Sequence, residues 1–151
     1  MATFISHSPA ATFGLGEAWA RQVVPGLVIG LSGDLGAGKT QLVKGLAKGL
    51  GVSARVSSPT FALVNEHPGG RLRLFHLDLY RLDTRAQIES AGLESYLSPA
   101  GVSVIEWAER WFETPDATAD CPRFRPRLYR EVRFEILSAD CRQITYEDFG
   151  F

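Results

Sequence analysis

Residues 33–40 read Gly-Asp-Leu-Gly-Ala-Gly-Lys-Thr and match the complete pattern GxxxxGK[ST]. The glycines allow the backbone to bend close to a polyphosphate, so that successive N–H groups point at it. The Lys39 side chain can reach the β- and γ-phosphates of a nucleotide, and the Thr40 hydroxyl can ligate Mg²⁺. We expect Lys39 to be exposed at the start of a helix. The residues predicted to surround the phosphates are Asp34, Leu35, Gly36, Ala37, Gly38, Lys39, Thr40 and Gln41.

The segments on both sides of this loop give the context that the pattern requires. Residues 27–32 form a short unbroken apolar run, which is typical of a strand buried on both faces. The helix predicted over residues 39–50 is amphipathic, and Gly51 is a natural end for it. A strand, a glycine-rich loop and an amphipathic helix in this order favour nucleotide binding over a turn that merely begins a helix.

Strands and helices are predicted to alternate along most of the chain. We expect helices over 8–23, 84–91, 93–97 and 107–112, strands over 61–66, 71–79 and 101–105, an irregular connection over 113–127, and a hairpin of strands 130–137 and 142–147. This order predicts an α/β fold of three layers, similar to that of P-loop NTPases. Its central sheet is expected to be mainly parallel, with a C-terminal antiparallel hairpin.

A phosphate-binding loop needs an acid at the end of a neighbouring strand, either to bind Mg²⁺ or to orient water. Glu106 follows the strand predicted over residues 101–105, and Asp78 lies at the end of the one before it. Because buried parallel strands end at the ligand side of an open sheet, both acids can lie near the phosphates. For each acid the alternative is a helix N-cap or a solvated residue, and the division of roles between the two stays open.

Other residues have two interpretations each. Thr60, in Ser58-Pro59-Thr60, belongs either to a switch loop that faces Mg²⁺ or the γ-phosphate, or to an ordinary loop. Trp107 either stacks on a base or a partner, or packs against the sheet. His76 is interpreted as a hydrogen-bonded structural residue. An arginine cluster either meets RNA or an acidic protein, or is solvated: Arg123, Arg125, Arg127, Arg130 and Arg133.

Length and composition exclude several classes of protein. We interpret the 151 residues as a single domain, residues 1–151. A hydrophobic content of 45% and a charged content of 22% exclude a disordered or collagen-like chain, and a net charge of −1 argues against wholesale polyanion binding. Two cysteines are too few for a disulfide framework. Without a basic N-terminal start or an apolar run of about 18 residues, we expect a cytoplasmic protein with no membrane contact.

Three more motifs follow the phosphate loop in order: Ser58-Pro-Thr-Phe61, Phe75-His-Leu-Asp-Leu-Tyr-Arg-Leu82 and Val104-Ile-Glu-Trp107. Together the four motifs resemble the bacterial TsaE (YjeE) family, the ATPase of tRNA threonylcarbamoyladenosine synthesis. The resemblance extends from about Ser8 to Glu109. Many families share the phosphate loop, whereas the His-x-Asp-Leu-Tyr-Arg and Ile-Glu-Trp motifs are far more selective.

The resemblance implies a small ATPase that uses ATP and Mg²⁺ and works with two partner proteins, TsaB and TsaD. In this family the partners transfer a threonylcarbamoyl group to the adenosine beside the anticodon, and ATP hydrolysis is thought to reset the complex between turnovers. The chain would therefore meet tRNA only indirectly. By matching position, the resemblance implies that Lys39 contacts phosphate, Thr40 ligates Mg²⁺, Glu106 is the second metal ligand or orients water, Asp78 supports the metal and Thr60 belongs to the switch.

Two other functions stay open from the sequence. A GTPase would carry an Asn-Lys-x-Asp motif, and the chain has none. A P-loop small-molecule kinase would transfer the γ-phosphate to a metabolite, although the chain has little length for a lid or an acceptor domain. A nucleotide-gated assembly module would bind ATP with negligible turnover. The oligomeric state, the adenine contacts and the partner docking surface do not follow from the sequence.

Overall fold

The computed structural model describes residues 1–52, 56, 63–68, 70–112 and 126–150. The strands are β1 (Ala2–Ser6), β2 (Leu27–Ser32), β3 (Val64–His67), β4 (Leu74–Asp78), β5 (Val102–Glu106), β6 (Leu128–Ile136) and β7 (Arg142–Phe149). The helices are α1 (Pro9–Ala20), α2 (Lys39–Leu50), α3 (Arg85–Ser90) and α4 (Glu109–Phe112), with a 3-10 helix, η1 (Glu94–Leu97).

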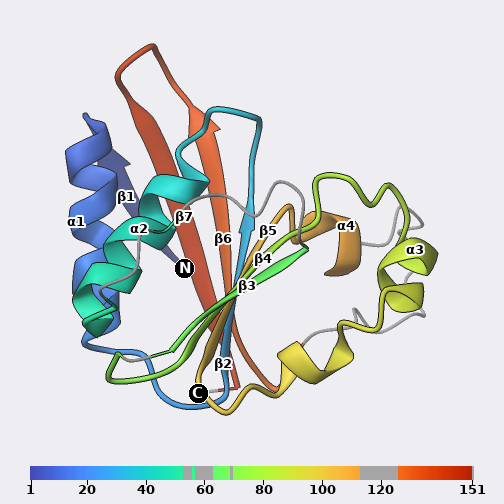
Figure 1. The fold of residues 1–151 in the computed structure, drawn as a ribbon. Helices are drawn as coiled ribbons and strands as arrows, with labels where there is room; N and C mark the ends of the chain where they lie inside the picture. The colour runs from blue at the N-terminus through green and yellow to red at the C-terminus, as the bar shows by residue number, and fades with distance from the viewer. Residues whose placement is uncertain (53–55, 57–62, 69, 113–125, 151) are drawn as a thin grey trace.

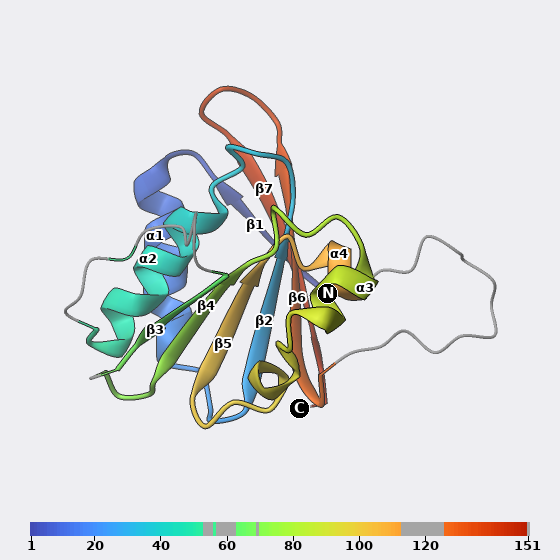
Figure 2. The same ribbon diagram turned by 45° about the vertical axis from the view of Figure 1, so that its right-hand side comes forward.

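All of these strands belong to one sheet, in the order β1-β7-β6-β2-β5-β4-β3. Its four central strands, β6, β2, β5 and β4, are parallel. The remaining pairs are antiparallel: β7 with β6, β1 with β7, and β3 with β4. Helices α1 and α2 lie on one side of the sheet, and α3 and α4 lie on the other (Figures 1 and 2). The predicted three-layer α/β fold with a mainly parallel sheet and a C-terminal hairpin is confirmed.

The central strands are apolar because side chains pack against both of their faces. In β2, Leu27, Ile29 and Leu31 contact the core under α1 and α2, whereas Val28 belongs to the core on the side of α3 and α4. Successive side chains of a strand point to opposite faces, so a strand that is covered on both sides needs an unbroken apolar run. The interpretation of residues 27–32 as a doubly buried strand is confirmed.

Helices α1 and α2 approach each other so closely that glycines are needed at the contact. A Cβ added at Gly45 would lie 1.9 Å from the backbone oxygen of Phe13, and one at Gly16 would lie 2.3 Å from that of Leu42. The Ser8 side chain accepts a hydrogen bond from the N–H of Ala11 and caps α1. Close packing of the two helices sets the position of the loop that precedes α2.

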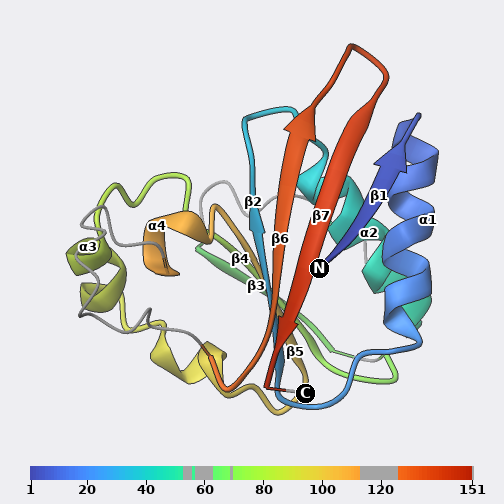
Figure 3. The same ribbon diagram turned by 180° about the vertical axis from the view of Figure 1, so that it is seen from behind.

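Several boundaries differ from the sequence predictions. Strand β1, which was not predicted, lies at the sheet edge beside β7 (Figure 3) and is mostly exposed, so no apolar pattern marks it. Helix α1 ends at Ala20 rather than at residue 23, and α4 begins at Glu109 rather than at residue 107. Residues 61–62 of the strand predicted over 61–66 lie outside the described residues. None of the helices in the described parts of the chain has the length and apolar character needed to cross a membrane.

Candidate functional site

The phosphate loop lies between β2 and α2, at the end of the sheet where the parallel strands finish (Figure 1). Gly36 and Gly38 have φ angles of 82° and 101°, in the left-handed region that glycine adopts most readily. Gly38 is the N-cap residue of α2 and contributes no side chain that could bond the first N–H groups of the helix. An anion at this position can accept hydrogen bonds from those N–H groups, which is the arrangement that phosphate binding requires.

The Lys39 side chain lies inside this loop. Its Nζ donates hydrogen bonds to the backbone oxygens of Gly33, at 2.5 Å, and of Asp34, at 3.0 Å. The same ammonium group lies 4.1 Å from the centre of the Trp107 ring. Only 5% of Lys39 is exposed, so the expectation of an exposed lysine is wrong. The loop therefore surrounds the Lys39 side chain. The hydrogen bonds of its ammonium group go to neutral backbone oxygens, which a phosphate can replace as acceptors.

Burial and nearby charge act on the Lys39 ammonium in opposite directions. Removal from water lowers the pKa of Lys39, since burial disfavours the charged form. The negative charges that oppose this shift belong to Glu106, Glu109, Asp78 and Asp34. The chain thus surrounds one buried cation with acids, an environment of the kind that is common at functional sites.

Glu106 joins the phosphate loop to the end of β5. The Thr40 hydroxyl donates to its carboxylate, with Oγ1 lying 2.9 Å from Oε1 and 3.2 Å from Oε2. The Nε2 atom of His76 lies 2.5 Å from Oε2, and Glu106 is only 3% exposed. Because the Thr40 proton points at Glu106, the lone pairs of the hydroxyl oxygen stay free to face a cation.

Asp78 lies beside Glu106, since the two residues are register partners at the ends of β4 and β5. Its Oδ1 accepts a hydrogen bond from the backbone N–H of Tyr80 at 2.9 Å. Both acids therefore lie at the phosphate-loop end of the sheet. The hydrogen bond from Thr40 goes to Glu106, and the division of roles between the acids stays a prediction.

The donor set fits Mg²⁺ rather than a metal that prefers histidine or cysteine. Within the described ranges, no group of three His, Cys, Asp or Glu side chains gathers around one metal position. Mg²⁺ is usually bound by one or two protein oxygens together with phosphate oxygens and water. A hydroxyl and a carboxylate beside a phosphate loop meet that requirement.

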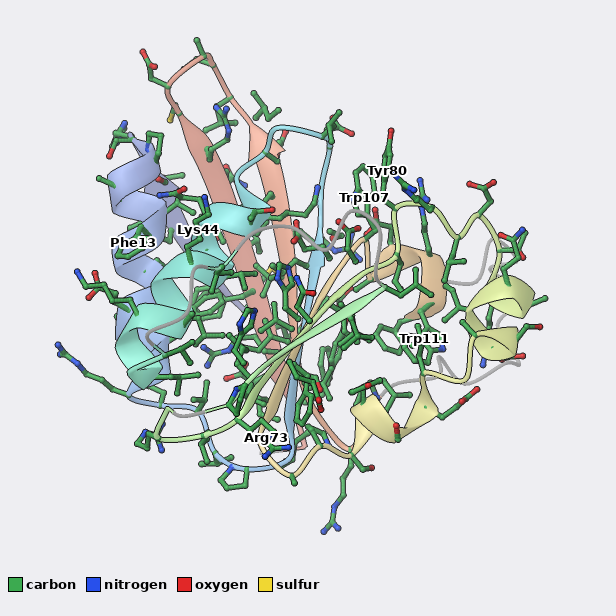
Figure 4. All side chains as sticks on the ribbon, viewed as in Figure 1. Phe13, Lys44, Arg73, Tyr80, Trp107 and Trp111 are labelled. Carbon is green, nitrogen blue, oxygen red and sulfur yellow. The ribbon has the colours of Figure 1, made fainter. Side chains whose placement is uncertain are left out.

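Trp107 connects the loops that follow β4 and β5. Its φ angle of 63° makes it the one non-glycine residue with positive φ in the described part of the chain, and this conformation ends β5 and delays α4. Its ring centre lies 5.2 Å from that of Tyr80 (Figure 4) and 5.0 Å from the Arg110 guanidinium. The guanidinium of Arg110 donates to three backbone oxygens of the loop after β4, those of Leu79, Tyr80 and Leu82. Trp107 thus packs on Lys39 and Arg110, two cations.

A hollow of about 140 Å³ lies beside the phosphate loop, between the start of α1 and the turn of the β6–β7 hairpin. Arg142 connects this turn to the loop, because it donates to the backbone oxygens of Gly36, at 3.3 Å, and Ser138, at 2.7 Å. Thr12 and Gln41 supply further polar groups. The sequence placed Gln41 at the phosphates but assigned no role to Thr12. It gave no sign of Arg142, because no local pattern brings the hairpin to this loop.

Two sequence hypotheses fall partly outside the described residues. Thr60 and the proposed switch loop lie there, as do Arg123 and Arg125 of the arginine cluster. Within the cluster, Arg130 is buried and forms two hydrogen bonds with Asp148, at 2.6 and 2.9 Å, and the exposed Arg133 pairs with Glu131 at 3.0 Å. Arg130 therefore supports the sheet and is not part of an RNA-binding surface.

Comparisons with known proteins agree with this geometry. The family model described as "Threonylcarbamoyl adenosine biosynthesis protein TsaE" matches residues 6–137. The protein named tRNA threonylcarbamoyladenosine biosynthesis protein TsaE is 46% identical over 70% of this chain in Synechocystis sp. and 43% identical over 67% of it in Bacillus subtilis. The matched regions span 69% and 63% of those two relatives, about two thirds of their length.

The fold has a close counterpart among solved structures. A crystal structure of YdiB from Bacillus subtilis aligns with a TM-score of 0.74 and 29% identity, over 99% of this chain and 86% of that one. The family match covers most of the chain, and the motifs that the structure describes, around Lys39, Asp78 and Glu106, lie together at one end of the sheet. The chain belongs to the TsaE family, which takes part in tRNA threonylcarbamoyladenosine biosynthesis.

Proposed function

We propose that residues 1–151 act as one P-loop ATPase domain, which binds ATP with Mg²⁺ and hydrolyses it during tRNA threonylcarbamoyladenosine synthesis in the cytoplasm. One observation carries most of this proposal: the hydroxyl of the phosphate-loop Thr40 donates to Glu106, an acid at the end of the neighbouring parallel strand. This pairing is what a Mg²⁺-dependent phosphate-loop enzyme needs at its metal position.

Each residue of the site has a distinct task in this proposal. Lys39 exchanges the carbonyl oxygens of Gly33 and Asp34 for phosphate oxygens, whose negative charge suits an ammonium group far better. Thr40 and Glu106 would hold Mg²⁺, with Asp78 beside them. When bound, the cation neutralises charge that develops on the phosphates. Glu106 orients the Thr40 hydroxyl. Its carboxylate also orients the water that attacks the γ-phosphate.

The nucleoside end of ATP is assigned to the hollow beside the loop. Its polar groups come from Thr12, Gln41 and Arg142, which can bond a ribose or a base. The hollow adjoins Gly36 and Gly38, so one nucleotide can reach both regions. Gln41, Thr12 and Arg142 are then the residues that set preference among nucleosides.

Partners complete the proposed reaction. We assign them as TsaB and TsaD, with ATP hydrolysis resetting the transferase between turnovers. A chain with a net charge of −1 is expected to bind tRNA weakly alone, so tRNA would be met through the complex.

Phosphate release from ATP, measured with and without the TsaB–TsaD pair and tRNA, tests this proposal. Release that the partners stimulate supports it. Transfer of the γ-phosphate to an added metabolite would instead indicate a small-molecule kinase. Tight ATP binding without release would indicate a nucleotide-gated assembly module.

A further inference from the structure

His76 has a position that a purely structural histidine does not need. It lies in the middle of β4, has no exposed surface, and its Nε2 lies 2.5 Å from Oε2 of Glu106. Its register partner on β5 is Val104, two residues before Glu106, so both side chains are on the face of the sheet that carries the phosphate loop. The imidazole therefore supports Glu106 from the interior of the protein.

The hydrogen-bonding pattern of the ring identifies its tautomer. Among the described residues, the Nδ1 atom of His76 is buried and has no hydrogen-bond partner. Buried N–H groups without an acceptor are rarer in proteins than acceptors without a donor. The proton is therefore on Nε2, where it meets Glu106, and Nδ1 carries only a lone pair.

Two donors then hold the Glu106 carboxylate: the Thr40 hydroxyl reaches both oxygens, and the His76 imidazole reaches Oε2. Thr40 donates from α2, and His76 donates from β4. Without His76, Oε2 would lose its shortest hydrogen bond inside the protein, and the carboxylate could turn away from the Thr40 hydroxyl. The orientation of the Thr40 hydroxyl toward a cation depends on its hydrogen bond with Glu106. A substitution of His76 would therefore weaken metal binding indirectly, by changing the position of Glu106.

We propose that His76 is a positioning residue, which holds Glu106 in its contact with Thr40 by donating the Nε2 proton. This inference rests on the proposed function, since it gives Glu106 a role in Mg²⁺-dependent ATP hydrolysis. It adds a residue that acts through Glu106 and does not itself touch nucleotide or metal.

Two substitutions of similar size separate this role from simple packing. Glutamine places its amide nitrogen near the position of Nε2 and can still donate to Glu106. Asparagine places its amide nitrogen near the position of Nδ1, which is too far from Glu106 for a hydrogen bond. Phe75 supplies the control, because it is the neighbour of His76 on β4, is buried at 7% exposure and belongs to the core on the other face of the sheet. Phe75→Leu removes part of a buried side chain of the same strand without a change at Glu106.

The variants are compared by kcat and KM for ATP, and by calorimetric ATP affinity with Mg²⁺ and with a chelator. We expect His76→Asn to lower kcat about tenfold or more and to weaken only the Mg²⁺-dependent part of ATP affinity. His76→Gln is expected to recover most of both quantities, and Phe75→Leu to keep kcat close to that of the wild type. Wild-type kcat in His76→Asn would overturn the proposal. Equal losses in His76→Asn and His76→Gln would also overturn it, because only packing would then matter.

A nuclear magnetic resonance measurement separates this inference from the ATPase proposal. The chain has three histidines, so ¹⁵N-histidine labelling of the nucleotide-free protein gives few signals. We expect His76 to show a proton on Nε2 and a bare Nδ1, and its signals to shift in Glu106→Gln while those of His7 do not. A proton on Nδ1, or no response to Glu106→Gln, would overturn the inference. If the wild type lacked ATP hydrolysis but kept this signature, the proposed function alone would fail.

Discussion

Replacing Glu106 with glutamine tests the acid on which the site depends. The change keeps the size of the side chain but removes its charge and one acceptor oxygen. The carboxylate accepts from Thr40 and lies 2.5 Å from His76 Nε2, and it is almost fully buried. A glutamine oxygen at the Oε2 position can accept from both donors, but the shorter contact of Thr40 with Oε1 is then lost. If the NH₂ group takes the Oε2 position instead, it faces Nε2 of His76, and the His76 proton must move to Nδ1.

The expected effect on turnover is much larger than the effect on folding. Loss of the charge that orients Thr40 and water is expected to lower turnover by about 10²-fold or more. Removal of a buried charge also relieves its desolvation, so the free energy of unfolding should change by only about 1 kcal/mol in either direction. For a chain of this length, that corresponds to a shift in melting temperature of roughly 2–4 °C. ATP affinity without Mg²⁺ should remain close to that of the wild type.

Single-turnover phosphate release, calorimetry with ATP and thermal unfolding measure the three quantities. Glu135→Gln is the control, because Glu135 is exposed on β6 and lies outside the site. Asp78→Asn should also lower turnover, and the double variant should lose less than the sum of both effects if the acids serve one metal. Wild-type turnover in Glu106→Gln together with an inactive Asp78→Asn would reverse the roles that we assign.

Three further changes test the loop, the helices and the partners. Thr40→Ala should reduce Mg²⁺-dependent turnover more than ATP affinity measured without Mg²⁺, and equal losses would make Thr40 a mere support of the loop. Gly45→Ala should lower the free energy of unfolding by about 1–3 kcal/mol, because its Cβ would meet the Phe13 backbone oxygen. Gly14→Ala, whose Cβ would have nothing within 4 Å, should not lower it, and thermal unfolding of both variants measures the difference. TsaB–TsaD should bind this chain more tightly with an ATP analogue than with ADP, and Thr60→Ala should shrink the difference; equal affinity in pull-downs would refute the switch.

Much of the site follows from local sequence. The apolar run of β2, the glycines and the amphipathic α2 form one continuous signal, and each part agrees with the others. The proximity of Asp78 and Glu106 could be predicted, because parallel strands end at the same edge of a sheet. In the structure the two residues are register partners. These predictions needed no knowledge of distant contacts.

The contacts that were not predicted join parts of the chain that are far apart in sequence. Arg142 meets Gly36 across 106 residues, and β1 is stabilised by β7 rather than by its own pattern. Burial of Lys39 depends on a loop that closes on its side chain and on Trp107 with a positive φ, neither of which residue spacing reveals. His76 was recognised as hydrogen-bonded, but its partner could not be identified without the register of β4 and β5.

The most direct test of the ATPase proposal is the rate of phosphate release from ATP and Mg²⁺ by Lys39→Ala, with TsaB, TsaD and tRNA present. Lys39 is buried, donates to two backbone oxygens and lies near several acids, so we expect a lower melting temperature, and thermal unfolding identifies the conditions under which the variant is folded. We predict that phosphate release falls to the level of the partners alone. Release at the wild-type rate by folded Lys39→Ala would contradict the assignment of this loop as the ATP site.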